Sequence, residues 1–144
     1  MTYTKAGYKP VSILLVEDDD IDAMSVTRAF ARMKMDNSIV RAKDGIEALE
    51  ILHAGQIEHP YLILLDLNMP RMGGLDLLRI LRTDSTLEAS VVFVLTTSKD
   101  EEDKLTAYKQ HVAGYIIKES LDNGFEQLVK MLDHYWRLIE LPEK

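Results

Sequence analysis

The chain has 144 residues, of which 47% are hydrophobic, so it can form one folded domain and is not intrinsically disordered. With 17 basic and 24 acidic residues the net charge is −7, which argues against direct binding to nucleic acid. There is no cysteine, no apolar stretch approaching the roughly 20 residues of a membrane span and no signal-peptide core, so we expect a cytoplasmic protein without disulfides.

Apolar runs alternate with helical patterns along the chain. Residues 1–10 show no periodicity and are predicted to be a flexible lead-in. The sequence then predicts strands at residues 13–16, 38–42, 61–65, 91–95 and 114–117. The predicted helices are residues 20–35, a helix opened by an Asp44 capping box, a third helix that buries Leu75, Leu78 and Leu81, and residues 99–110 and 121–138.

Five consecutive strand–helix units are typical of an α/β domain in which helices cover both faces of a parallel sheet. We therefore expect a single doubly wound (βα)5 domain at residues 11–140, with a five-stranded parallel sheet of flavodoxin-like order 2-1-3-4-5. Residues 141–144 are predicted to be a tail, and no output domain is expected.

Reactive side chains follow four of the predicted strands. The first strand ends in Glu17 and Asp18, the third in Asp66, the fourth in Thr96 and the fifth in Lys118. Because ligands bind at the carboxyl ends of parallel strands, we expect these groups to meet at one edge of the sheet. The three carboxylates suit Mg²⁺ and would repel one another without a cation.

Acidic residues after the first strand have a second explanation, because acids also favour helix N-termini. Capping is the favoured explanation for Asp19 and Asp20, whereas for Glu17 and Asp18 it weakens once the other strand ends are counted. A metal, an ammonium, a hydroxyl and a carboxylate nucleophile together form a phosphoryl-transfer site.

Other catalytic patterns are missing from the sequence. There is no candidate acyl-transfer triad, and there is no glycine-rich nucleotide loop, so the phosphoryl group must come from elsewhere. The histidines lie in or beside predicted helices without metal-ligand spacing, and we expect surface positions for His53, His59, His111 and His134.

The chain resembles the receiver domain of two-component response regulators over residues 11–138. The segments that carry this resemblance are LVEDD at 15–19, KDGIEAL at 43–49, LLDLNMPRMGG at 64–74, LTT at 95–97 and GYIIK at 114–118. The resemblance implies that Asp66 accepts a phosphoryl group from a phosphohistidine on a sensor histidine kinase. It also implies a signalling protein that is not a turnover enzyme.

The family pattern assigns roles to the neighbours of Asp66. Lys118 would contact the acyl phosphate, Thr96 would turn toward it, and Tyr115 would change rotamer as the switch. Mg²⁺ would be held by the side chains of Glu17, Asp18 and Asp66 and by the backbone carbonyl of Asn68.

The chain departs from the family pattern at two positions. Glu119 replaces the usual proline after Lys118, so we expect a trans peptide there. Thr97 stands beside the phosphosite where many members have Ala or Gly. With the Tyr135-Trp136 pair and the Leu141-Pro142 ending, these features resemble the short stand-alone regulators that partner bacterial phytochrome kinases.

Two other functions are compatible with a strand-terminal aspartate. Phosphatases of the haloacid dehalogenase class also use such an Asp with Mg²⁺, and they place a second acid two residues later. This chain has Asn68 at that position, and an asparagine cannot donate a proton to a leaving group. A degenerate receiver that only binds partners is the other alternative, and the complete set of acids, Thr96 and Lys118 argues against it.

Two surfaces are predicted to bind partners. Ile21, Met24 and Ala31 form an apolar strip on the first helix, opposite the Phe30 face, where we expect the kinase to dock unless the helix is buried on two sides.

We also expect a homodimer through the last two helices and the fifth strand. The predicted core stripe of the last helix is Leu121, Phe125, Leu128, Val129, Leu132, Trp136 and Ile139. Met131, Tyr135 and Leu138 widen its apolar arc, unless the tail folds back over them.

Overall fold

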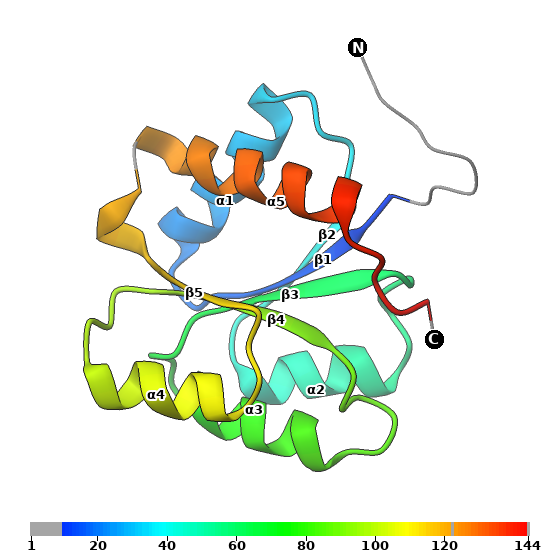
Figure 1. Cartoon of the computed structure of the whole chain (residues 1–144), viewed down its shortest axis with the longest axis vertical. Coiled ribbons are helices and arrows are strands. Elements are labelled where there is room, and N and C mark those ends of the chain that lie inside the picture. The colour runs from blue at the N-terminus through cyan, green and yellow to red at the C-terminus, as the bar shows by residue number, and fades with distance from the viewer. Residues whose placement is uncertain (1–9, 122, 144) are drawn as a thin grey trace.

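The structure is a computed structural model that describes residues 10–121 and 123–143. One parallel sheet lies at its centre, in the order β2-β1-β3-β4-β5, which confirms the predicted topology (Figure 1). The strands are β1 (Ser12–Val16), β2 (Ile39–Ala42), β3 (Tyr61–Leu65), β4 (Val91–Thr96) and β5 (Gly114–Ile117).

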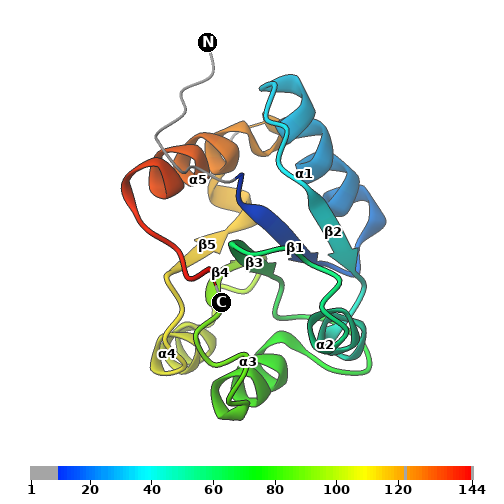
Figure 2. The ribbon, with the colours of Figure 1, turned by 90° about the vertical axis from the view of Figure 1, so that its right-hand side faces the viewer.

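Helices cover both faces of the sheet. Figure 2 shows α1 (Asp20–Arg32) and α5 (Glu126–Leu138) on one face, and α2 (Gly45–His53), α3 (Gly74–Thr83) and α4 (Glu101–Lys109) on the other. Every residue of β1 and β3 is buried, which explains the uninterrupted apolar runs at residues 13–16 and 61–65. Alternate residues feed two cores, with Leu14 and Ile63 on the α2–α4 side and Leu15 and Leu64 on the α1–α5 side.

Asp19 and Asp44 cap α1 and α2, the two helices whose capping residues the sequence predicts. The Asp19 carboxylate accepts hydrogen bonds from the amides of Ile21 (2.8 Å) and Asp22 (3.0 Å), so Asp19 caps α1. Asp44 caps α2 by accepting from the Glu47 amide at 2.9 Å. The Glu47 carboxylate reaches back to the Lys43 amide at 2.9 Å, one residue before the position of a standard capping box.

Three helix predictions were wrong in detail. Helix α1 ends at Arg32, not at residue 35, and α3 buries Leu77 with Leu78 and Leu81, whereas Leu75 is only partly buried. Helix α5 begins at Glu126, not at residue 121. The φ angles of Gly124 (67°) and Phe125 (64°) interrupt the helical backbone before that point.

The predicted core stripe of the last helix is correct except at Ile139, and Leu121 and Phe125, which lie before α5, are partly buried against the same core. Leu128, Val129, Leu132 and Trp136 are buried, but Ile139 is exposed. Leu141 is buried against the same core, so the tail does fold back, yet Leu138 remains 81% exposed. Met131 and Tyr135 are partly buried against the α1–α5 core. The folded-back tail therefore leaves Leu138 uncovered.

The predicted lead-in and tail are only partly described. Residues 1–9 and Lys144 lie outside the described residues, so the prediction of a flexible lead-in stays a prediction. Within the described residues, no helix is both long enough and apolar enough to cross a membrane.

Candidate functional site

The strand register brings the predicted site residues to one edge of the sheet. Val16 of β1 is paired with Leu65 of β3, so Glu17 and Asp66 leave neighbouring strands at the same level. Thr96, the last residue of β4, is paired with Ile117 of β5, and Lys118 follows directly. The four strand ends therefore converge, as parallel strands require.

Three carboxylates form a candidate metal centre. Oxygen atoms of Glu17, Asp18 and Asp66 all lie within 4.8 Å of one another, with Glu17 and Asp66 buried and Asp18 exposed. Burial raises the pKa of Glu17 to about 7, against the lowering effect of its hydrogen bond to Lys118. Close oxygen donors with one open side suit a hard divalent cation, so the residues present fit the predicted metal.

Lys118 extends into this acidic cluster. Its Nζ lies 2.7 Å from Glu17 Oε1 and 3.6 Å from Asp66 Oδ2. Burial disfavours the charged ammonium, but hydrogen bonds and the charges of the surrounding carboxylates outweigh that effect and raise the pKa of Lys118. The peptide between Lys118 and Glu119 is trans, as predicted, since within the described residues the only cis peptide is His59–Pro60.

Thr96 and Tyr115 are both connected to Ser98 in the loop after β4. The fully buried Thr96 accepts a hydrogen bond from the Ser98 amide through Oγ1 at 3.3 Å. The Tyr115 hydroxyl donates to the Ser98 carbonyl at 3.0 Å. Thr97, which follows Thr96, is exposed. The two predicted switch residues therefore share one backbone segment.

The loop that carries Asn68 is held at both ends. The Asn68 amide donates to Asp66 Oδ1 at 3.3 Å, and Arg71 makes two hydrogen bonds to Asp44, of 2.6 and 3.0 Å. At Gly74 a Cβ atom would collide with the Asp66 carbonyl, so only glycine allows α3 to start this close to the strand end. These contacts fix the backbone from which the Asn68 carbonyl would reach a metal.

Two residues of the site escaped the sequence analysis. Asp22 of α1 places Oδ2 2.7 Å from Lys118 Nζ, and Arg41 of β2 donates two hydrogen bonds to the Glu17 carbonyl, of 2.9 and 3.0 Å. Arg41 also pairs with Asp20 at 2.6 Å. The predicted surface positions of the histidines are confirmed, because all four histidine residues are exposed.

Comparison with known families identifies the class of protein. The response regulator receiver domain family matches residues 13–133, and this chain belongs to that family. Receiver-domain regulators are signalling proteins and not turnover enzymes, so the predicted class is confirmed and the phosphatase alternative is set aside.

Two relatives match this chain over most of their own length. Over 131 residues the chain is 33% identical to response regulator Rcp1 of Synechocystis sp., covering 88% of this chain and 89% of Rcp1. A probable methanogenesis regulatory protein, FilR2 of Methanothrix harundinacea, is 36% identical over 130 residues, covering 88% of this chain and 84% of FilR2.

Two solved structures of response regulators are similar to this chain over most of its length. The phosphorylated cyanobacterial phytochrome response regulator RcpA is 34% identical, with a TM-score of 0.82 over 93% of this chain and 99% of RcpA. The Mn²⁺-bound form of Rcp1 is 31% identical, with a TM-score of 0.81 over 92% of this chain and 99% of that one. The predicted resemblance to phytochrome response regulators is confirmed at this level.

Proposed function

We propose that Asp66 is the phosphoryl acceptor of a Mg²⁺-dependent phosphorelay, and that a sensor histidine kinase supplies the phosphoryl group. The observation that carries this proposal is the position of Asp66. Its buried carboxylate shares one cluster with Glu17 and Asp18 and lies 3.6 Å from the Lys118 ammonium. A nucleophile, a cation and metal ligands are thus within reach of one incoming phosphoryl group.

The reaction follows from the chemistry of these groups. A carboxylate oxygen of Asp66 attacks the phosphorus of the kinase phosphohistidine, the phosphorus–nitrogen bond breaks, and the imidazole keeps the electron pair and takes up a proton. Mg²⁺, held by Glu17, Asp18, Asp66 and the Asn68 carbonyl, would supply positive charge against the transferring phosphoryl oxygens. Lys118 neutralises the phosphoryl oxygens on the side of α1.

Thr96 and Tyr115 then convert the chemistry into a change of shape. In this proposal Thr96 turns its hydroxyl to the phosphoryl group, with Thr97 beside it, and gives up its bond to the Ser98 amide. Tyr115 changes rotamer with it, because its hydroxyl is bonded to the same residue. The face formed by α4, β5 and α5 then transmits this change of shape through protein–protein contacts.

We propose that the kinase is of the bacterial phytochrome class and that the protein acts in the cytoplasm. The resemblance to RcpA, whose name describes a phytochrome response regulator, supports the kinase class.

We also propose a homodimer through α4, β5 and α5. Leu105 and Tyr108 on α4 and Leu138 on α5 are exposed apolar side chains on these elements, which supports a docking role for them.

Labelling with acetyl phosphate tests the central proposal. With Mg²⁺ present, we expect wild-type protein to gain the mass of one phosphoryl group and Asp66→Asn to gain none. Asp76→Asn removes an equal charge from the exposed surface of α3 and should label like wild type. Full labelling of Asp66→Asn would overturn the assignment, and an unlabelled wild type would favour the degenerate receiver.

A further inference from the structure

The nearest partners of the Lys118 ammonium do not include the proposed phosphoryl acceptor. Nζ lies 2.7 Å from Glu17 and 2.7 Å from Asp22, both within hydrogen-bond distance, whereas Asp66 lies 3.6 Å away. An ammonium has three N–H donors, so two of the three are already engaged. Asp22 thus holds the cation that the phosphoryl group on Asp66 would need.

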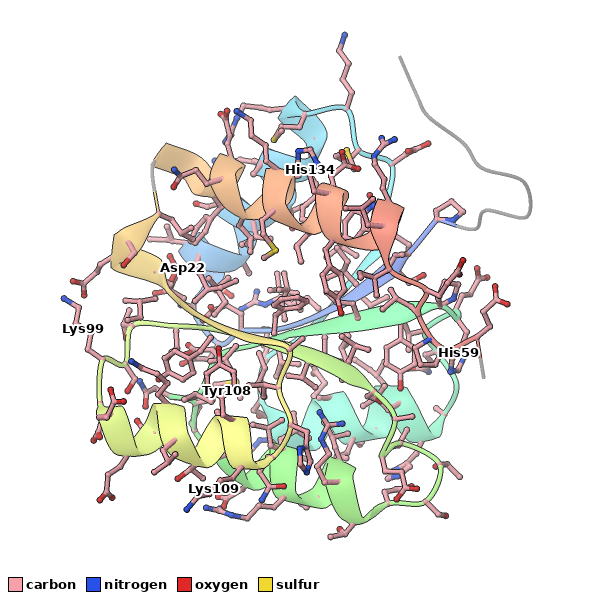
Figure 3. All side chains as sticks on the ribbon, viewed as in Figure 1. Asp22, His59, Lys99, Tyr108, Lys109 and His134 are labelled. Carbon is pink, nitrogen blue, oxygen red and sulfur yellow. The ribbon has the colours of Figure 1, made fainter. Side chains whose placement is uncertain are left out.

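Asp22 lies on a helix, whereas the residues of the acidic cluster follow the ends of strands. It belongs to the first turn of α1, and its own amide donates to the Asp19 cap at 3.0 Å, so its backbone is fixed by the helix start. Figure 3 shows Asp22 between α1 and the segment that follows β5. Its carboxylate is not one of the three clustered metal ligands.

The surroundings of this pair make its charges effective. The Lys118 side chain is only 9% exposed and that of Asp22 is 30% exposed, so water screens their attraction less than it screens a surface pair. A carboxylate at this position offsets the positive charge that Lys118 presents to Asp66. An anion arriving at Asp66 therefore meets a weaker cation than the lysine alone would provide.

We propose that Asp22 is a positioning residue that competes with the phosphoryl group for Lys118. In the unphosphorylated protein the Lys118 ammonium is shared by Glu17 and Asp22. When Asp66 is phosphorylated, the ammonium turns to a phosphoryl oxygen and its contact with Asp22 weakens. Asp22 thereby lowers the affinity of the site for the phosphoryl group. This inference rests on the proposed function of Asp66.

Binding of beryllium fluoride in the presence of Mg²⁺ tests the inference, because this anion adds to an aspartate carboxylate in place of a phosphoryl group. Asp22→Asn keeps the size of the side chain but removes its charge, so we expect a dissociation constant roughly three- to tenfold lower than that of wild type by calorimetry. Asp22→Ala should shift it in the same direction. Asp76→Asn, an equal change of charge on α3, should leave it unchanged.

A double-mutant cycle shows whether the effect acts through Lys118. Lys118→Ala should bind beryllium fluoride more weakly than wild type, and adding Asp22→Asn to it should bring no further change. An equal gain with and without Lys118 would overturn the inference in favour of a general charge effect. Unchanged or weaker binding by both Asp22 variants, with native circular dichroism, would also overturn it. Failure of wild type to bind the anion would instead contradict the proposed function itself.

Discussion

The hydroxyl of Tyr115 donates a hydrogen bond to the backbone carbonyl of Ser98 at 3.0 Å, which connects β5 to the loop that follows β4. Burial raises the pKa of Tyr115 above its ordinary value. The phenol is therefore a neutral donor at physiological pH. The amide of Ser98 also donates a hydrogen bond to Thr96 Oγ1. A rearrangement of Thr96 can therefore be passed to Tyr115 through Ser98 alone.

Removing the Tyr115 hydroxyl should show whether its hydrogen bond to the Ser98 carbonyl is present in the unphosphorylated state, in the activated state or in both. Tyr115→Phe leaves the Ser98 carbonyl without its donor, so we expect the free energy of unfolding to fall by about 1 kcal/mol. If the bond breaks on activation, the difference should vanish when Mg²⁺ and beryllium fluoride are bound. Urea unfolding of both proteins in both states measures this, and an undiminished difference would rule out the proposed rotation.

The metal site should depend on Asp18. Asp18→Asn removes one negative ligand while preserving its size, and we expect the affinity for Mg²⁺ to fall about tenfold or more. Asp76→Asn is the matched control, because Asp76 lies on the exposed surface of α3 and outside the cluster. Mg²⁺ titrations of the three proteins decide the matter. Equal affinities for wild type and Asp18→Asn would remove Asp18 from the metal site.

The first helix should be the docking surface for the kinase. Ile21 is 75% exposed and Met24 is 48% exposed, so the alternative of burial on two sides is wrong for these residues. Met24→Glu should slow phosphoryl transfer from the kinase roughly five- to tenfold, because a charge replaces an apolar contact. Labelling by acetyl phosphate should be unaffected. Equal loss of both activities would point to misfolding.

Self-association should require the exposed apolar residues of α4 and α5. Leu105→Glu with Leu138→Glu places two charges on that face, and both side chains are exposed, so the fold should be preserved. Sedimentation should show a dimer for wild type and a monomer for the double variant. Ile21→Glu, an equivalent change on α1, should remain dimeric. A wild type that stays monomeric with and without phosphorylation would refute the homodimer.

The hydrogen bond between His53 and Asp84 should make stability depend on pH. Hydrogen bonds from His53 and Thr86 lower the pKa of Asp84 to about 2, from an ordinary value of 3.8. The ionised carboxylate therefore favours the folded state above about pH 4, and this contribution is lost as the pH falls toward 2. Asp84→Asn should be less stable at pH 7, with a difference that shrinks on acidification. A difference independent of pH would contradict this.

The sequence predicted strands better than helix ends, for a physical reason. The run at residues 61–65 coincides with β3, because a fully buried strand is recognised by its continuous apolar sequence. The run at residues 114–117 coincides with β5, whose residues are partly buried. The start of α5 was misplaced because Phe125 is apolar at a helical spacing, while its left-handed backbone ends that pattern. Several leucines in α3 made its buried face ambiguous on a helical wheel.

The carboxyl edge of the sheet was predictable because strand order and register alone bring Glu17, Asp66 and Lys118 together. Asp22 was not predictable in the same way. An acid in the first turn of a helix is adequately explained by the helix dipole, so its residue type gives no sign of a partner 96 positions away. Only the packing of α1 against the segment after β5 places it beside Lys118.

Trp136 is the only tryptophan in the chain, and it is buried with its ring 6.5 Å from that of Phe30. Among the residues that the structure describes, no hydrogen-bond partner is found for its Nε1. A buried indole reports on its packing more than on solvent. The fluorescence emission of Trp136 therefore reports how α5 packs against α1. It allows folding to be observed separately from the chemistry at Asp66.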